Sequence, residues 1–296
     1  MLLREFPNLR WLKQRIQQAE PWPHCVLNIH TTRAWRPGVK GPVSLFVNLR
    51  GFSHCTVEHR RTCLDQQRYF LTRAGDLYDL EIDNAQGTET LNIHFAEGFP
   101  EAVYQAWTDR AVDRPLLLFN QSFARTPAFD QLLQYFYTDL HQGYLRHSEE
   151  EWLTRIMLHL LDCHESAFQR YCQLARKSST SETLFRQLSW SIDYMHTYYH
   201  RSLSLDDLAA VACMSKYHYL RYFKRYTHKT PYQYLRHLRI EKACEHLRKS
   251  HLPLEHLAHL TGFESLSVFS RSFRQLKGQS PSHYRSSLKG NQKLCP

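Results

Sequence analysis

The sequence of 296 residues lacks several patterns that would assign it to a common class of protein. It has no Cys-x-x-Cys pair, and its eight cysteines are scattered, which is typical of reduced thiols in a cytosolic protein and not of a disulfide framework. No apolar run approaches the roughly 20 residues that a membrane span needs, and the N-terminus lacks the apolar stretch of a signal peptide. We therefore expect a cytoplasmic protein without a membrane partner.

Motifs of catalysis are also missing from the sequence. There is no Gly-x-Gly-x-x-Gly or P-loop pattern for a nucleotide, and no Gly-x-Ser-x-Gly setting for a nucleophile. The His-x-His spacing of a common barrel metal site is absent too, although the sequence contains 19 histidines. We expect no catalytic residues, no cofactor and no bound metal.

The charge is distributed unevenly along the chain. Residues 1–180 hold 20 Lys and Arg and 20 Asp and Glu, whereas residues 181–296 hold 18 and 8, so the net charge of +10 lies in the C-terminal part. A basic domain joined to a neutral one favours a polyanionic partner for the basic domain. The length fits two domains, which we place at residues 1–175 and 184–296, with a polar linker at 176–183.

One pattern in the basic part occurs twice, about fifty residues apart. The copies read LSLDDLAAVACMSKYHYLRYFKRYTHKTPYQYLR, starting at Leu203, and LPLEHLAHLTGFESLSVFSRSFRQLKGQSPSHYR, starting at Leu252. Each copy predicts a short helix, a tight turn, and a second helix capped by Ser215 or Ser265. The second helix is basic and aromatic in the first copy and basic in the second, as a helix-turn-helix motif needs for insertion into the major groove.

The apolar positions of the two second helices predict which side faces inward. In the first copy these positions are Tyr219, Tyr222 and Phe223. In the second copy they are Phe273 and either Val268 or Phe269. The remaining side chains of each helix are expected to face outward.

A longer helix is predicted between the copies, starting at Pro231. Its roughly 18 residues span about 27 Å at 1.5 Å per residue. This length can hold two recognition helices near one duplex turn, about 34 Å, apart. The predicted C-terminal domain is therefore all-α, with two helix-turn-helix units joined by a linker helix.

Residues 184–288 resemble the DNA-binding domain of the AraC/XylS family of bacterial transcription regulators. The resemblance lies in the segments SLDDLAAVACMSKYHYLRYFKR, TPYQYLRHLRIEKACEHL and LEHLAHLTGFESLSVFSRSFRQLKGQSPSHYR. These contain the elements G-F-x-S, F-x-R-x-F-[KR] and S-P-x-x-[YF]-R in full. The resemblance implies a sequence-specific regulator, most commonly an activator, that binds double-stranded promoter DNA and works with RNA polymerase.

The resemblance also implies which positions read bases. They are Lys216, Tyr217, Leu220 and Arg221 in the first copy, and Leu266, Ser267, Ser270 and Arg271 in the second. Lys224 and Arg274 also face outward, and we expect Lys224 to contact phosphate. Arg221 is the strongest candidate for a bidentate contact with guanine, with a phosphate contact as the alternative.

Two of these positions depart from the usual pattern of the family. Leu220 and Leu266 stand where many relatives have polar residues, so they contact thymine methyl groups or contribute little. With its basic and aromatic side chains, the first recognition helix is expected to supply most of the direct readout. The second is expected to serve docking and weak discrimination.

From about Cys25 to Phe95 the pattern changes to short strands. The runs CVLNIHT, VSLFVNL, HCTVEHR, RYFLTR, DLYDLEI and TLNIHF are divided by turn signals at Pro37-Gly38, Gly41-Pro42, Ala74 to Asp76 and Asn84 to Gly87. They predict a small antiparallel barrel or sandwich, which makes the chain α+β. Two amphipathic helices follow within residues 129–172, and their apolar stripes either pack on the barrel or form a partner surface.

This N-terminal part is similar, more loosely, to the cupin-like sensing and dimerisation domains of the same family. The resemblance implies a barrel that binds a small-molecule effector and a homodimer contact through the two helices. His30, Tyr78 and His94 are candidates for lining the effector pocket. Two alternatives stay open, a metal-dependent cupin enzyme with a DNA-targeting module and a constitutive DNA-binding protein whose N-terminal domain only dimerises.

Overall fold

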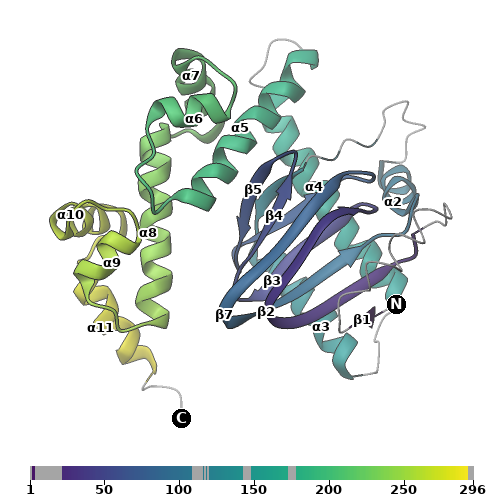
Figure 1. Cartoon of the computed structure of the whole chain (residues 1–296), viewed down its shortest axis with the longest axis horizontal. Coiled ribbons are helices and arrows are strands. Elements are labelled where there is room, and N and C mark those ends of the chain that lie inside the picture. The colour runs from purple at the N-terminus through teal and green to yellow at the C-terminus, as the bar shows by residue number, and fades with distance from the viewer. Residues whose placement is uncertain are drawn as a thin grey trace. The chain divides into compact units, whose positions relative to one another are not determined.

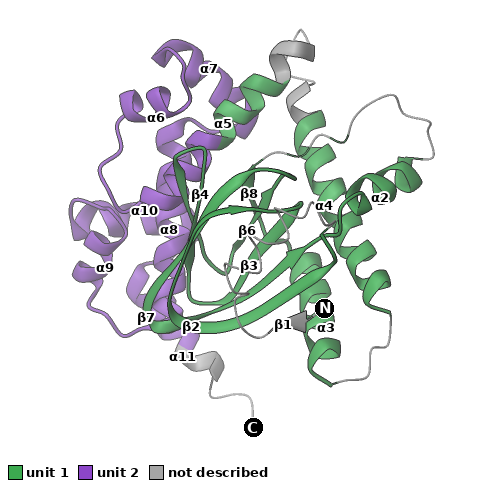
Figure 2. Ribbon diagram, turned by 45° about the vertical axis from the view of Figure 1, so that its right-hand side comes forward, with its two compact units in different colours: residues 1–189 green, residues 190–296 purple. Residues whose placement is uncertain are grey.

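The computed structural model describes residues 2–3, 22–108, 116, 118, 120–142, 148–172 and 178–292. The chain divides into two compact units, Met1–Ser189 and Trp190–Pro296 (Figure 2). The boundary falls within α5 (Ser178–Tyr198), a helix that also includes most of the expected linker at 176–183. In the described part of the chain, all strands belong to the first unit, and the second unit is helical, which confirms the predicted α+β fold.

The first unit is a curved sheet that forms a nearly closed, mainly antiparallel barrel (Figure 1). The strand order is β1-β2-β7-β3-β6-β8, and the hairpin of β4 and β5 joins the sheet through β7. The strands of the described part are β1 (Leu2–Leu3), β2 (Cys25–Lys40), β3 (Ser44–Arg50), β4 (Ser53–Val57), β5 (Arg60–Leu64), β6 (Arg68–Thr72), β7 (Leu77–His94) and β8 (Gln121–Ala124).

Two of the predicted turns are irregularities inside long strands. DLYDLEI and TLNIHF are the two halves of β7, and the register of β2 against β7 shifts between them. Gly87 adopts a left-handed φ of 82° there, and its carbonyl accepts a hydrogen bond from Nδ2 of Asn84. A second register shift lies at Gly38, with φ of 61°. The turn prediction at these two sites was wrong because glycine in a strand also permits a bulge, which bends the sheet without ending it.

The outer face of the barrel is covered by helices. Side chains that alternate along β3 and β7, such as Leu45 and Ile93, share one hydrophobic core with helix residues such as Phe136 and Leu160. The described helices of this unit before α5 are α2 (Phe99–Thr108), α3 (Pro127–Gln142) and α4 (Glu149–Cys172). The apolar stripes of α3 and α4 therefore pack on the barrel of their own chain.

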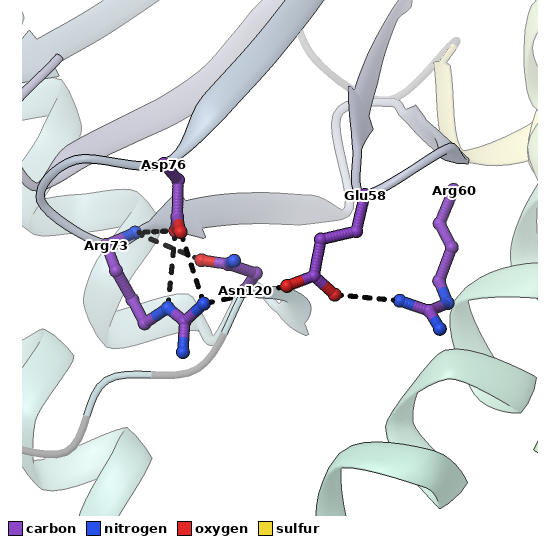
Figure 3. A network of polar contacts seen from close by, with 5 residues as sticks. All are labelled: Glu58, Arg60, Arg73, Asp76 and Asn120. Atoms are coloured by element: carbon purple, nitrogen blue, oxygen red, sulfur yellow. Dashed lines mark hydrogen bonds and ion pairs between the residues drawn. The ribbon is translucent and has the colours of Figure 1, made fainter. Parts of the chain in front are cut away.

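A polar network joins the β4–β5 hairpin to the turn before β7 (Figure 3). The Glu58 carboxylate accepts a hydrogen bond from Nη1 of Arg60 at 2.9 Å and lies 3.7 Å from Nη2 of Arg73. The Arg73 guanidinium also pairs with Asp76 at 3.1 Å, and its backbone N–H donates to the side chains of Asp76 and Asn120. The bond to Asp76 closes the turn that the sequence predicts between β6 and β7.

The second unit repeats one packing arrangement twice. In the first copy the ring of Phe223 lies 5.6 Å from that of Tyr234, and in the second copy Phe273 lies 5.4 Å from Tyr284, both edge-on. The helices after α5 are α6 (Leu205–Val211), α7 (Lys216–Thr227), α8 (Pro231–Lys249), α9 (Leu254–Leu260), α10 (Leu266–Lys277) and α11 (Pro281–Gln292). The sequence repeat is therefore a repeat of structure, with α8 as the predicted helix between the copies.

Candidate nucleic-acid interface

Local capping fixes the first helix-turn-helix motif, α6 and α7. Ser204 and Asp207 form a capping box at the start of α6, and Ser215 caps α7 by accepting from the backbone N–H of His218. The turn between the helices places Cys213 at a left-handed φ of 51°. On the inner side of α7, Tyr219 and Phe223 are fully buried.

The outer side of α7 presents the residues that the sequence predicts. Lys216, Tyr217, Leu220, Arg221 and Lys224 are all exposed, with Tyr217 at 71% and Leu220 at 39%. Helix α7 contains no acidic residue, and its last turn adds Lys224 and Arg225. A basic face with protruding aromatic and aliphatic groups suits the electronegative major groove.

The ammonium of Lys216 is paired within the motif. Its Nζ lies 2.6 Å from Oδ1 of Asp206 on α6, and both side chains are more than half exposed. This predicted reading position therefore has a carboxylate neighbour in the structure.

The second motif, α9 and α10, turns at a glycine. Gly262 has a φ of 84°, and a Cβ there would lie 2.6 Å from the carbonyl oxygen of Tyr199 and 2.9 Å from Nε of Arg239. Nε of Arg239 donates to the same carbonyl at 2.8 Å. Gly262 is thus required both for the turn and for the close approach of two chain segments.

Helix α10 resolves the choice between two inward residues. Phe269 and Phe273 are fully buried, whereas Val268 is 42% exposed. The predicted outer residues Leu266, Ser267, Arg271 and Arg274 are exposed, and Ser270 is half-buried. Sequence reasoning left the exposure of Val268 undecided because aliphatic residues at the start of a helix fit either face.

Contacts with α8 hold α10 in place. Nζ of Lys277 lies 2.6 Å from Oε1 of Glu241, and Nη1 of Arg236 donates to Oε1 of Gln275 at 3.0 Å. The 19 residues of α8 span about 28 Å at 1.5 Å per residue. Figure 1 shows α8 running between the two motifs.

In the first unit, two of the three effector candidates share the inner face of the barrel. The Phe46 ring lies 5.1 Å from that of Tyr78 and 6.0 Å from that of His94. Oγ of Ser44 donates to the carbonyl of Pro42 at 2.8 Å, so Nδ1 of His94, also 2.8 Å away, donates to Oγ. Burial lowers the pKa of His94 to about 4, so its ring is neutral at pH 7.

The third candidate, His30, lies apart from this pair. It is exposed and lies opposite Glu89 of β7 in the strand register. Leu91 and Ile93, which are two and four residues after Glu89 and therefore on the same face of β7, belong to the outer core. Because successive side chains of a strand point to opposite faces, His30 belongs to the outer face. Tyr137 of α3 donates to the Glu89 carboxylate there at 2.9 Å.

Two further polar residues on the inner face were missed by sequence reasoning. Thr90 and Asn92 alternate with apolar residues on β7 and are 1% and 2% exposed. Oγ1 of Thr90 and Nδ2 of Asn92 have no hydrogen-bond partner among the described residues. The signal in the sequence is that TETLNIHF alternates polar residues with Leu91, Ile93 and Phe95, which belong to the outer core.

The described residues lack both a metal-binding cluster and a membrane-spanning helix. They contain no group of three or more His, Cys, Asp or Glu side chains placed to hold a metal ion. None of their helices is both long and apolar enough to cross a membrane.

Comparison with known proteins places both motifs in one domain family. Residues 208–287 match the model of a helix-turn-helix domain. The MmsAB operon regulatory protein of Pseudomonas aeruginosa is 38% identical over 92 residues, which are 31% of this chain and 30% of the relative. MarA of Salmonella typhimurium is 29% identical over 112 residues, or 38% of this chain and 85% of the relative.

The helix-turn-helix region of this chain is of the AraC/XylS type. A solved structure of the AdpA DNA-binding domain in complex with a target DNA is similar to this chain with a TM-score of 0.36. It is 27% identical and covers 37% of this chain and 98% of that one. The match spans only 30% of the MmsAB regulator and 36% of AlkR from Acinetobacter baylyi, so this chain matches about a third of these relatives' length.

Proposed function

We propose that this chain is a sequence-specific DNA-binding regulator of transcription that responds to a small molecule. The observation that carries the proposal is the repeated exposure of an arginine at the same position of two capped helices, Arg221 on α7 and Arg271 on α10. Arginine makes the most common specific contact with guanine in the major groove. The residue range 184–296 is the DNA-binding part in this proposal.

The length of α8 supports a bipartite site. Its span of about 28 Å is near the roughly 34 Å that separates successive major grooves on one face of the duplex. One chain would therefore contact two half-sites with α7 and α10.

Selection of binding sites from a random duplex library tests this proposal directly. The full-length protein should enrich a sequence whose footprint has two protected segments about one helical turn apart. Equal affinity for selected and random duplexes, measured at the same salt concentration, would refute sequence-specific binding.

We assign effector binding to residues 1–175, on the inner face of the barrel. Thr90 and Asn92 support this assignment because buried polar groups without partners cost free energy that a bound molecule can recover. The neutral His94 and the phenol of Tyr78 lie on the same face. We expect an uncharged polar metabolite with a hydrogen-bond acceptor for Nδ2 of Asn92.

A thermal-shift screen of metabolites, followed by measurements of DNA affinity, tests effector control. An effector should raise the melting temperature of the wild-type protein and change its affinity for the selected site. Asn92→Leu should abolish both responses and leave the DNA affinity of the free protein unchanged. If no metabolite changes DNA affinity, the alternative of a constitutive DNA-binding protein is preferred.

We further propose that the protein activates transcription together with RNA polymerase and that it forms a homodimer. It would be located in the cytoplasm, on the nucleoid when bound to DNA. The dimer contact must use surfaces other than the apolar stripes of α3 and α4, because these stripes are buried on the barrel. Light scattering of the purified protein should give twice the mass of 35.3 kDa. Transcription in vitro should rise on addition of the protein, and a fall would identify a repressor.

A further inference from the structure

The first turn of α10 exposes two aliphatic side chains. Leu266 is 37% exposed and Val268 is 42% exposed. The corresponding positions of α7, fifty residues earlier, hold Lys216 and His218. The two helices thus present different chemistry at the same place in the repeat.

Helical geometry places the two aliphatic residues on either side of the predicted reading surface. At 100° per residue, Leu266 and Val268 lie 200° apart, with Ser267 midway between them and Arg271 about 40° further round from Ser267. Their positions are fixed because Phe269 and Phe273 occupy the buried side. Oγ of Ser265 accepts from the backbone N–H of Val268 at 3.3 Å, which holds the first turn.

The basic charge of α10 indicates which partner binds this surface. Helix α10 has no acidic residue, and Arg271 and Arg274 are exposed beside the aliphatic pair. Such a face attracts DNA, and the N-terminal residues of a recognition helix contact base edges. Among the four standard bases, thymine presents an apolar group, its C5-methyl, in the major groove.

We propose that Leu266 and Val268 read thymine methyl groups in the half-site bound by α10. The inference rests on the proposed function, because it requires that α10 enters the major groove. It adds a chemical difference between the half-sites, with hydrogen-bonding side chains prominent on α7 and aliphatic contact prominent on α10. The thymines of the α10 half-site should then be recognised by their methyl groups.

Replacing thymine by uracil in the DNA removes only the methyl group and tests this proposal. The full-length protein and a site selected from random sequence are used, and each dT is replaced by dU in turn. The α10 half-site is identified as the segment that loses protection in Arg271→Ala. We expect at least one replacement there to lower affinity by about two- to fourfold, as the loss of one buried methyl group should.

Variants of the protein connect the effect to the two side chains. Val268→Thr keeps the shape of the side chain but adds a hydroxyl, and Leu266→Ala shortens the other. In each variant the loss caused by the dU replacement at its own contact should shrink. Leu220→Ala on α7 is the matched control and should leave the dU effect in the α10 half-site unchanged.

A gain of a methyl group provides the converse test. At a position where dT is preferred over dC, 5-methylcytosine carries a methyl group at the same place in the groove and should recover part of the affinity lost with dC. The gain should be absent in the double variant L266A/V268A. Circular dichroism and retained protection of the α7 half-site show that this variant is folded.

The outcomes separate the inference from the proposed function. Intact sequence-specific binding without any dU effect in the α10 half-site would overturn the inference alone. A dU effect of equal size in the double variant would also overturn it, because the methyl groups would then act through DNA shape. No preference for any sequence would instead overturn the proposed function.

Discussion

Nζ of Lys216 lies 2.6 Å from Oδ1 of Asp206 and joins the two helices of the first motif. Both groups are well exposed, so the pair contributes little to stability. The pair has a larger expected effect on DNA binding, because a carboxylate beside the predicted reading residue Lys216 opposes the approach of phosphates. The second motif has Glu255 at the position of Asp206, but Leu266 at the position of Lys216.

Asp206→Asn should therefore strengthen DNA binding. We expect affinity for selected and random duplexes to rise several-fold at low salt, because Lys216 becomes available to the DNA and a negative charge is removed. The free energy of unfolding should change by less than about 1 kcal/mol. Fluorescence anisotropy at several salt concentrations measures the effect, which should be accompanied by a steeper salt dependence.

Glu255→Gln is the matched control for this prediction. It removes the same charge from the second motif without releasing a lysine, so its gain in affinity should be smaller. Equal gains in the two variants would mean that the Lys216 contact has no role and that overall charge accounts for both.

The two motif turns differ in a way that stability measurements can detect. Gly262 and Cys213 hold equivalent positions, both with left-handed φ. Gly262→Ala should destabilise the protein by about 2 kcal/mol or more, because a left-handed alanine is strained and its Cβ would meet the carbonyl oxygen of Tyr199. Cys213→Gly should stabilise it by about 0.5 kcal/mol, since relief of left-handed strain outweighs the added entropy of the unfolded chain.

Urea unfolding followed by far-ultraviolet circular dichroism measures both turn variants. Cys213→Ala, which retains the strain and removes the thiol, is the control and should not reproduce the gain. If Cys213→Gly lowers stability, the left-handed turn at this position is not the source of strain that we infer.

Arg221 of α7 and Arg271 of α10 hold equivalent positions and allow base contacts to be distinguished from phosphate contacts. Arg221→Ala and Arg271→Ala should each weaken binding to the selected site by about 1–3 kcal/mol and weaken binding to random DNA less. Lys224→Ala should weaken both alike and reduce the slope of log affinity against log salt by about one. Losses that are equal on the two kinds of DNA would show that the arginines contact phosphate.

The sequence predicted the C-terminal unit in more detail than the N-terminal one. Local patterns indicate a helix-turn-helix motif, since the serine caps, the helical spacing of Phe223 and Phe273 and the glycine of the second turn can each be recognised within a few residues of sequence. The duplication of the motif strengthened the prediction, because the same helices and caps are indicated independently by each copy. The ion pair of Lys216 with Asp206 was not predictable, because it depends on how two exposed side chains meet.

The details of the barrel could not be predicted, because they depend on contacts between strands that are far apart in the sequence. Glycine at 38 and 87 marks a bulge or a turn equally well, and only pairing with a neighbouring strand distinguishes them. The face of each candidate follows from that pairing as well. His30 lies opposite Glu89 in the strand register and is on the outer face of the barrel. His94 lies opposite Cys25 and Ser44 and is on the inner face.

The buried imidazole of His94 should make the barrel sensitive to acid. Burial lowers its pKa from 6.5 to about 4 in the folded protein, so between these pH values the unfolded chain binds more protons than the folded one. Stability should therefore fall as the pH decreases from about 6.5 toward 4. His54, whose pKa burial also lowers to about 4, should add to the same trend.

His94→Asn tests this pH dependence, because asparagine keeps a donor for Ser44 and does not titrate. Five of the six tryptophans precede residue 189, so their fluorescence during urea unfolding mainly reports on the barrel. Between pH 7 and pH 5 the variant should lose less stability than the wild type. Ser44→Ala removes the hydrogen bond but retains the imidazole, so it should lower stability at both pH values and keep the wild-type dependence. A wild-type slope in His94→Asn would show that other groups cause the acid sensitivity.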